Sequence, residues 1–383
     1  RCPRNAPFPQ TAHPLSYASQ RLAKGAQLLG LTVQPNSLAV LSAPRSDRPS
    51  CNYCGGCQRG CQLTDKGSID VTYLRKAVAT GFCEIRAATE VLKLQTNGDK
   101  ITGALVATGM KQQVITADIV FVACGAVQTP RLLLNSADKF SPNGMCNENG
   151  LLGRNFMETL LFTSTAMHPD NLGSHRGLPV DWVAWDYNAP DSIPNVLGGC
   201  RFGPAMAESD LVGPVSYATR LLDGWGKAHK QAMRTSFGQV LSVAALGECL
   251  PNHKSYITLS ERTDHHGMPV PKIHSQLGQD AHDRLRFMAS VCRNILRSTG
   301  AGPILEEFSS VDAFSSTHVF GTCRMGQTAQ DSVVDPWGRS HRWPNLFITD
   351  GSIFPSTGGG ESPGLTIQAL ALRAADHLLK QSI

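Results

Sequence analysis

The apolar positions along the chain fall into short periodic segments separated by long irregular stretches. In residues 17–29 the apolar side chains recur on one helical face, and Gly30 can end the helix that this pattern predicts. Residues 34–60 are rich in Pro, Ser, Gly and Cys, which indicates a loop. A second helix is expected over 72–80. Short strands are then expected around Cys83–Arg86 and Val91–Leu94.

The segment Asp118–Cys124 is continuously apolar after its first residue, which is typical of a buried parallel strand. Gly125 follows it, and Thr129 and Pro130 have the residue types of an N-cap and a first helical position. They predict a helix over Arg131–Asn135. A strand, a glycine turn and a helix in this order are typical of doubly wound sheets.

The middle of the chain, roughly 155–315, has isolated strands rather than this alternation, which indicates a second domain with an antiparallel sheet. A turn is expected at Asp264–Gly267 because its residues favour turns. The expected strands are Gly238–Ala245, Ser255–Leu259 and Pro269–Ile273, and a long helix should follow over 280–299.

The last part returns to the α/β pattern. A short apolar strand, Asn345–Thr349, ends at Asp350, and a loop with three glycines leads into a helix. Ser362 and Pro363 have the residue types of its N-cap and first position. The expected buried stripe of this helix is Ile367, Leu370, Ala371, Ala374 and Leu378.

Composition narrows the class of protein. With 383 residues, of which 41% are hydrophobic and 17% charged, the chain is long enough for a large core and two domains. No run of eighteen apolar residues exists, so no transmembrane segment is expected in this chain. The net charge of +5 is scattered along the sequence, which makes nucleic acid an unexpected partner. The chain begins Arg1-Cys2 with no Met or signal peptide, and we expect it to be a fragment.

Three motifs are candidates for chemistry, and each has a purely structural alternative. The strand, glycine turn and helix of residues 120–134 can bind phosphate or ribose, or serve as scaffold. His318, in the stretch 318–326, is either a general base or a core histidine bonded to backbone. In 345–378, the acid at the strand end and the following helix N-terminus can bind a hydroxylated cofactor and stabilise negative charge, or serve as scaffold.

The ordered occurrence of these motifs over roughly 60–383 resembles the glucose–methanol–choline (GMC) oxidoreductases. The stretches that carry the resemblance are Ala123–Gly125, Thr129–Leu133, Gly153–Met157, Leu259 with Asp264, Gly267 and Pro269, and then 318–326 and 345–355. The resemblance implies an α/β fold in which a doubly wound FAD-binding domain, here incomplete, carries a second, α+β substrate domain built on an antiparallel sheet.

The resemblance also implies the domain boundaries. The FAD-binding domain is expected over 1–154, with a Cys-rich segment at 51–61, and again over 318–383, which carries the catalytic loop. The substrate domain is expected over 155–317. The Gly-x-Gly-x-x-Gly fingerprint that binds FAD in this family does not occur, and we expect it in a missing N-terminal segment.

The resemblance implies the site residues. His318 occupies the position of the base that removes the hydroxyl proton while a hydride passes to flavin N5. Ser362 stands where the family has His or Asn, so it is either a substrate contact or only a helix cap, and Glu361 beside it is another candidate. The implied FAD contacts are Val91 at the adenine, Cys124 and Gly125 at the ADP end, Asp350 and Gly351 at the pyrophosphate or ribityl chain, and Gly364, Leu365 and Thr366 at the flavin pyrimidine.

Four cysteines, Cys51, Cys54, Cys57 and Cys61, have the spacing of a bacterial ferredoxin ligand run. They are expected to bind a [3Fe–4S] or [4Fe–4S] cluster, to bind zinc, or to form disulfides. The segment resembles the flavoprotein subunits of gluconate, fructose and glucose dehydrogenases, some of which carry a [3Fe–4S] centre.

The expected function is therefore FAD-dependent oxidation of an alcohol or sugar hydroxyl, with electrons passed to a non-nicotinamide acceptor. The implied acceptor is a cytochrome or quinone, the implied partner is a small subunit, and the implied location is the periplasm. One alternative is a sterol or long-chain alcohol oxidase. Another is a non-catalytic iron–sulfur electron-transfer protein, against which His318 argues because a carrier needs no base.

Overall fold

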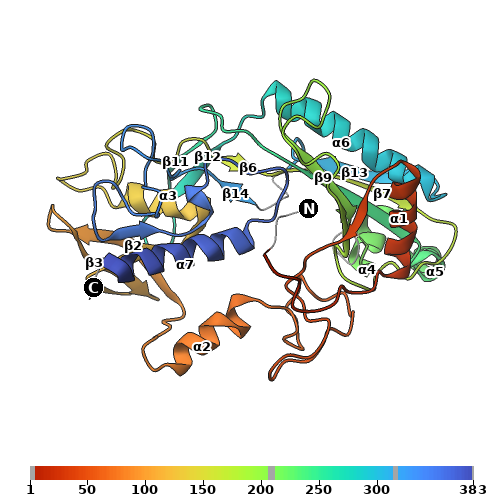
Figure 1. Cartoon of the computed structure of the whole chain (residues 1–383), viewed down its shortest axis with the longest axis horizontal. Helices are drawn as coiled ribbons and strands as arrows, with labels where there is room; N and C mark the ends of the chain where they lie inside the picture. Colours follow the sequence, from red (N-terminus) through yellow and green to blue (C-terminus); the bar gives the residue numbers. More distant parts are fainter. Residues whose placement is uncertain (1–4, 206–211, 314–317, 382–383) are drawn as a thin grey trace. The chain divides into compact units, whose positions relative to one another are not determined.

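The computed structural model describes residues 5–205, 212–313 and 318–381, and they form two compact units (Figure 1). The first unit combines residues 1–85, 160–247 and 282–315, and the second combines 86–159, 248–281 and 316–383. The chain therefore crosses from one unit to the other several times, and each unit is assembled from segments far apart in the sequence.

The first unit is built on a six-stranded antiparallel sheet. Its strands, in spatial order, are β1 (Val33–Pro35), β8 (Trp182–Ala184), β9 (Cys200–Pro204), β10 (Val240–Gly247), β7 (Leu160–Met167) and β13 (Ile304–Ser309). Strand β10 lies inside the sheet, and most of its residues are buried. The expected isolated strand near 238–245 is thus a central strand of a larger sheet.

Two helices of the first unit, α1 (Tyr17–Leu28) and α6 (Gln279–Ser298), pack against each other and against β10. A Cβ atom on Gly25 would lie 2.8 Å from the carbonyl oxygen of Ile295, so the two backbones approach closely there. The predicted helices 17–29 and 280–299 are confirmed. Shorter helices of this unit are η1 (Ile69–Val71), α2 (Tyr73–Ala79), α4 (Pro214–Ser216), η2 (Tyr217–Leu221) and α5 (Gly226–Ser236).

The second unit contains several small sheets around one apolar core. They are the antiparallel sheet of β2 (Thr89–Thr96), β3 (Ile101–Thr108) and β4 (Lys111–Thr116); the parallel pair β5 (Val120–Val122) and β15 (Leu346–Ile348); the hairpin β11 (Tyr256–Thr263) and β12 (Pro269–His274); and the pair β6 (Met157–Glu158) and β14 (Val319–Phe320). Its helices are α3 (Gly125–Asn135), η3 (Gly351–Ile353) and α7 (Gly364–Gln381).

The predicted parallel strand at 118–124 is confirmed, since β5 pairs in parallel with β15. Its predicted burial is wrong in part, because only Val122 is buried and Phe121 is 43% exposed. The core that surrounds this pair contains residues of β2, β3, β5, α3 and β15 and of the loops between them. It includes Leu94, Ile101, Val122, Leu133, Met145, Val334, Trp343, Leu346 and Ile348. The fold is α/β with antiparallel sheets, as the sequence predicted.

Three local predictions are wrong. Residues 83–86 form no strand. Helix α3 begins at Gly125 rather than at Arg131, so Thr129 and Pro130 lie inside it. Helix α7 begins at Gly364, because the carbonyl of Pro363 accepts the first helical bond from Ile367, so Ser362 precedes the cap instead of providing it.

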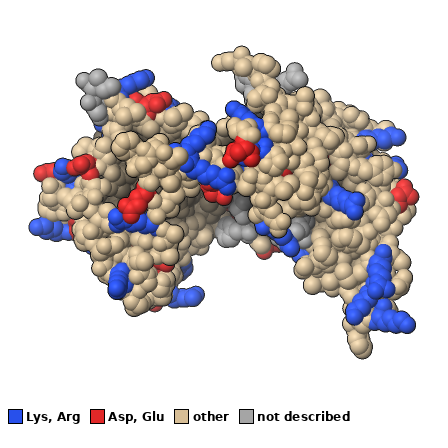
Figure 2. Space-filling view, turned by 90° about the horizontal axis from the view of Figure 1, so that it is seen from below, with Lys and Arg blue, Asp and Glu red and all other residues tan. Residues whose placement is uncertain are grey.

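Charges on the surface are mixed. Figure 2 shows Lys and Arg side chains dispersed among Asp and Glu over the face in view, as the scattered charge of the sequence predicts. Among the residues that the structure describes, no helix is long and apolar enough to cross a membrane.

The core of the second unit provides a stability test. Leu133 is fully buried in that core, so Leu133→Ala should lower the free energy of unfolding by about 2–5 kcal/mol through lost burial and a residual cavity. Leu379→Ala on α7, where the side chain is 63% exposed, is the matched control and should change it by about 0.5 kcal/mol or less. Chemical denaturation measures both, and equal losses would contradict the assignment of this core.

Candidate active site

The carboxyl ends of β5 and β15 meet, because parallel strands end on the same edge of a sheet. Asp350 follows β15 and is almost completely buried. Its Oδ2 accepts a 2.9 Å hydrogen bond from the backbone N–H of Gly125 and a 2.5 Å bond from the hydroxyl of Thr129. Its Oδ1 accepts from the backbone N–H of Ser352 at 2.8 Å. One carboxylate thus joins the start of α3 to the loop after β15.

Gly351 brings a third segment to the same place. A Cβ atom at this position would lie 2.8 Å from the carbonyl oxygen of Val319, the residue after His318, and 3.9 Å from the Ile367 side chain in α7. Such close backbone contact excludes a larger residue. The loop after β15, the strand that follows His318 and the first turns of α7 therefore converge on Gly351.

His318 directly precedes β14 and is half-buried. Its carbonyl oxygen accepts a 3.0 Å hydrogen bond from the backbone N–H of Thr159, which extends the pairing of β14 with β6 by one residue. The backbone of His318 is therefore fixed by strand pairing, and its neighbour Val319 lies against Gly351. This placement suits a side chain that must be held in one orientation.

Thr322 has a role that sequence reasoning missed. Pro130 lies inside α3 and has no N–H, so the carbonyl of Ala126, four residues earlier, lacks its usual helical donor. The buried hydroxyl of Thr322 donates to that carbonyl at 2.7 Å, and the carbonyl of Thr322 accepts from Gly153 at 2.7 Å. The missing donor of Pro130 is a signal from which such a partner could have been expected.

The glycine before Thr322 explains the tight packing of this loop. Gly321 has a φ of +94°, and a Cβ atom there would lie 2.1 Å from the carbonyl oxygen of Asn155. The 318–326 stretch, the 153–157 stretch and α3 are thus three sequence motifs packed directly on one another. Gly321 and Thr322 therefore have packing roles. His318 is the residue of this stretch that the sequence singles out as a candidate base.

The remaining predicted cofactor residues are on the surface of the second unit. Val91 on β2 is 46% exposed and Cys124 is exposed beside Gly125. Gly364, Leu365 and Thr366 form the exposed first turn of α7, and Leu365 is 77% exposed. Backbone N–H groups in a first helical turn lack helical acceptors, so this turn favours negative charge.

These residues fit FAD. The carboxyl edge of the parallel pair is the usual place for a nucleotide cofactor. A Cβ atom on Gly125 or Gly364 would meet nothing within 4 Å, so a ligand can approach both backbones, and Cys124 and the first turn of α7 are open to solvent. Cys124 and Gly125 would hold the ADP end, and Gly351 and residues 364–366 would lie nearer the ring system.

The four clustered cysteines lie in the first unit and are free thiols. Burial, the largest cause, raises the pKa of Cys51 to about 12 and also raises that of Cys57. The Cys61 thiol donates to the carboxylate of Asp65. In the described part of the chain, no three of these sulfurs come close enough together to bind one ion, so cluster binding stays a prediction.

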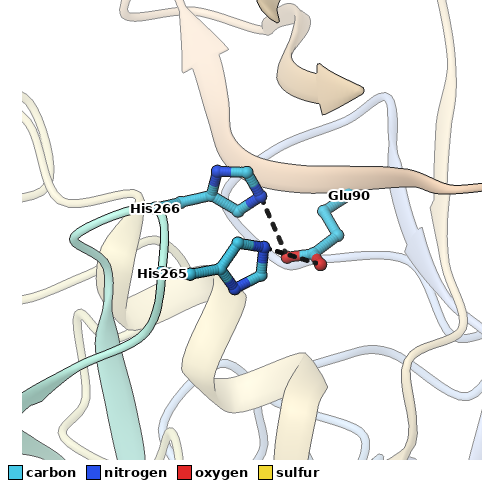
Figure 3. Close-up of side chains that lie close together, drawn as sticks. All are labelled: Glu90, His265 and His266. Carbon is cyan, nitrogen blue, oxygen red and sulfur yellow. Dashed lines mark ion pairs between the residues drawn. The ribbon is translucent and has the colours of Figure 1, made fainter. Parts of the chain in front are cut away.

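A different group of potential metal ligands does come together. Glu90, next to Val91, lies beside the adjacent pair His265 and His266 in the turn between β11 and β12 (Figure 3). Sequence reasoning recognised the turn but did not connect it with Glu90. The two consecutive histidines could have been recognised in the sequence as possible ligands. Glu90, 175 positions before His265, could be recognised as their partner only from the fold.

Comparison with known proteins identifies the class. GMC oxidoreductase family models match residues 9–160 and 251–371, and the chain belongs to this family, whose cofactor is FAD. It is 28% identical to 2-methyl-1,2-propanediol dehydrogenase of Mycolicibacterium austroafricanum over 92% of this chain and 64% of the relative. It is 27% identical to the fructose dehydrogenase large subunit of Gluconobacter japonicus over 98% of this chain and 68% of that subunit.

A solved structure shares the fold. Pyridoxine 4-oxidase from Mesorbium loti superposes with a TM-score of 0.66 at 18% identity, covering 94% of this chain and 69% of that one. The chain thus spans about two thirds of the length of the proteins that it resembles. The sequence-based assignment to the GMC family, and its likeness to fructose dehydrogenase, are confirmed.

The Asp350 contacts predict an energetic coupling. Asp350→Ala should lower the free energy of unfolding by about 1–3 kcal/mol, because it leaves the Gly125 N–H and the Thr129 hydroxyl without their acceptor. Thr129→Val removes one of the same bonds. The free energy of unfolding lost in the double variant should therefore be smaller than the sum of the two single losses, by about 0.5 kcal/mol or more. Urea unfolding measures the cycle, with exposed Asp376→Ala as control; strictly additive losses would contradict a shared bond.

Proposed function

We propose that the full-length protein carrying this chain oxidises a CH–OH group of an alcohol or sugar with FAD as the electron acceptor. The observation that carries the proposal is the convergence on Gly351 of three segments: the strand after His318, the loop after Asp350 and the start of α7. Family membership supports the same chemistry, since the proteins it resembles include dehydrogenases of a diol and of fructose by name.

In this proposal His318 is the catalytic base. When bound, FAD supplies a two-electron acceptor for the hydride that leaves the carbinol carbon. The imidazole of His318 accepts the hydroxyl proton, so that the C–O bond becomes a carbonyl as the hydride departs. Its backbone is held by the bond to Thr159, which lowers the cost of orienting the ring.

Ser362 and the first turn of α7 have supporting roles. Ser362 is exposed just before the helix and offers one hydroxyl to a substrate oxygen, in place of the His or Asn of other family members. The N-terminus of α7 stabilises negative charge on a bound ring. Ser362→Ala should therefore lower the turnover rate much less than removal of the base.

We further propose that electrons leave to an acceptor other than nicotinamide, such as a cytochrome or quinone. The likeness to a protein named as a large subunit supports a multi-subunit arrangement with a small partner subunit. An iron–sulfur centre at Cys51, Cys54, Cys57 and Cys61 would connect flavin and acceptor, but it requires these sulfurs to move together. A broad absorbance shoulder that survives flavin extraction would support it.

The test of the base is His318→Ala in the full-length protein. With a mediator dye under anaerobic conditions, the rate of alcohol-dependent dye reduction should fall by about 10²–10⁴. Bound flavin should remain, because His318 is not among the residues proposed to hold FAD. His229→Ala on α5 replaces a histidine in the other unit and should leave the rate unchanged.

Two results would contradict parts of the proposal. An unchanged rate in His318→Ala would remove His318 as the base. If oxygen replaces the dye with equal or higher efficiency, and long-chain alcohols or sterols are preferred over sugars, the protein is an oxidase of that type.

A further inference from the structure

Three side chains in the second unit converge at a point that the proposed oxidation does not use. The Nε2 atom of His265 lies 3.6 Å from Oε1 of Glu90, and the Nε2 atom of His266 lies 3.6 Å from Oε2. The ligand atoms of all three lie within 4.8 Å of one another. Figure 3 shows both rings directed from the β11–β12 turn toward the carboxylate on β2.

The spacing differs from that of a hydrogen-bonded cluster. A hydrogen bond from an imidazole N–H to a carboxylate is about 2.7–3.2 Å long, and both contacts are longer than this. A tetrahedral metal with bonds of about 2.0–2.1 Å holds neighbouring ligand atoms about 3.3 Å apart. The two histidine–carboxylate contacts are within a few tenths of an ångström of that spacing, and rotation of the exposed His265 and Glu90 side chains can bring the three ligand atoms, which lie within 4.8 Å of one another, onto one ion.

The turn that carries the histidines is held in place. The carboxylate of Asp264 accepts from the backbone N–H groups of His266 at 2.8 Å and Met268 at 3.0 Å. Its other oxygen pairs with Arg131 of α3, whose Nε also donates to Pro269 at 2.8 Å.

The exposure of the three groups suits a metal site open on one side. The His266 side chain is 3% exposed, so its ring is fixed among protein atoms, while His265 and Glu90 are 66% and 53% exposed. His265 and His266 are adjacent in sequence, their ring centroids lie 4.0 Å apart, and both rings point toward the Glu90 carboxylate (Figure 3). One carboxylate and two imidazoles are a ligand set of borderline divalent ions such as Zn²⁺.

We infer that Glu90, His265 and His266 bind a Zn²⁺-type divalent cation, with water completing its coordination. The bound ion ties the start of β2 to the β11–β12 hairpin, two segments that are about 175 positions apart in the chain. It also fixes the residue before Val91, the proposed adenine contact. The site is separate in residues and role from the proposed oxidation, and its test does not depend on that activity.

Cobalt titration of the purified, chelator-treated chain tests the site. Co²⁺ bound by two imidazoles and a carboxylate has visible d–d absorption without the near-ultraviolet thiolate band that binding at Cys51–Cys61 would add. Zn²⁺ should displace this signal. His265→Asn and Glu90→Gln alter exposed side chains, so both variants should fold, and each should weaken binding at least 10-fold.

His253→Asn replaces another exposed histidine of the same unit and is the matched control. It should bind cobalt as the unmodified chain does. Saturating Zn²⁺ should also raise the melting temperature of the unmodified chain and of the control, but not of Glu90→Gln.

Two results would overturn the inference. One is a cobalt spectrum in which the thiolate band accounts for all binding. The other is an equal affinity and an equal thermal shift in the unmodified chain, His265→Asn and Glu90→Gln.

Discussion

The carboxylate of Asp350 is the interaction on which the second unit depends. A buried carboxylate is stable only when its oxygens accept hydrogen bonds, and Asp350 finds donors in Gly125, Thr129 and Ser352. Two of these donors belong to α3 and one to the loop after β15. Although Asp350 and Gly125 are 225 positions apart, this bond fixes together the two strand ends at which we propose the cofactor binds.

Pro130 imposes a second constraint on the same helix. It removes one helical donor, and Thr322 supplies a replacement from the stretch that begins with His318. Helix α3, the stretch that begins with His318 and the loop after β15 are therefore connected by the hydrogen bonds of Asp350 and Thr322. Gly321 and Thr322, in the same stretch as His318, hold this backbone against Asn155 and α3.

Sequence analysis predicted the larger features. The apolar run at 118–124 predicted the strand that is β5, and the helix expected over 280–299 is α6, because burial in a core requires apolar side chains at regular positions. The family resemblance grouped Cys124, Gly125, Asp350 and Gly351 as cofactor contacts; the structure brings Gly125 and Asp350 together, and their cofactor role stays a prediction. The predicted start of α3 was wrong because Thr129 and Pro130 have cap-like residue types. Inside the helix the Thr129 hydroxyl instead donates to Asp350, and the Ala126 carbonyl that Pro130 leaves without a helical donor accepts from Thr322; both partners are distant in sequence.

Contacts between distant segments account for the rest of what the sequence did not reveal. In the sequence, nothing distinguishes Glu90 from the other acidic residues. It becomes a candidate ligand only because the fold brings β2 beside the β11–β12 turn. Ser362 precedes the cap of α7 because the carbonyl of Pro363 accepts the first helical hydrogen bond. Residue types alone do not determine which of two adjacent residues begins a helix. The four cysteines have a ligand-like spacing, yet their separation in space depends on loop conformation.

The central claim is that the carboxyl edge of β5 and β15 holds a flavin that accepts electrons from an alcohol or sugar. The most direct measurement is the absorbance spectrum of the full-length protein, recorded anaerobically before and after adding candidate alcohols and sugars. The account predicts flavin bands at about 370 and about 450 nm that bleach with one class of substrate. A folded, colourless protein that takes up no FAD would contradict it.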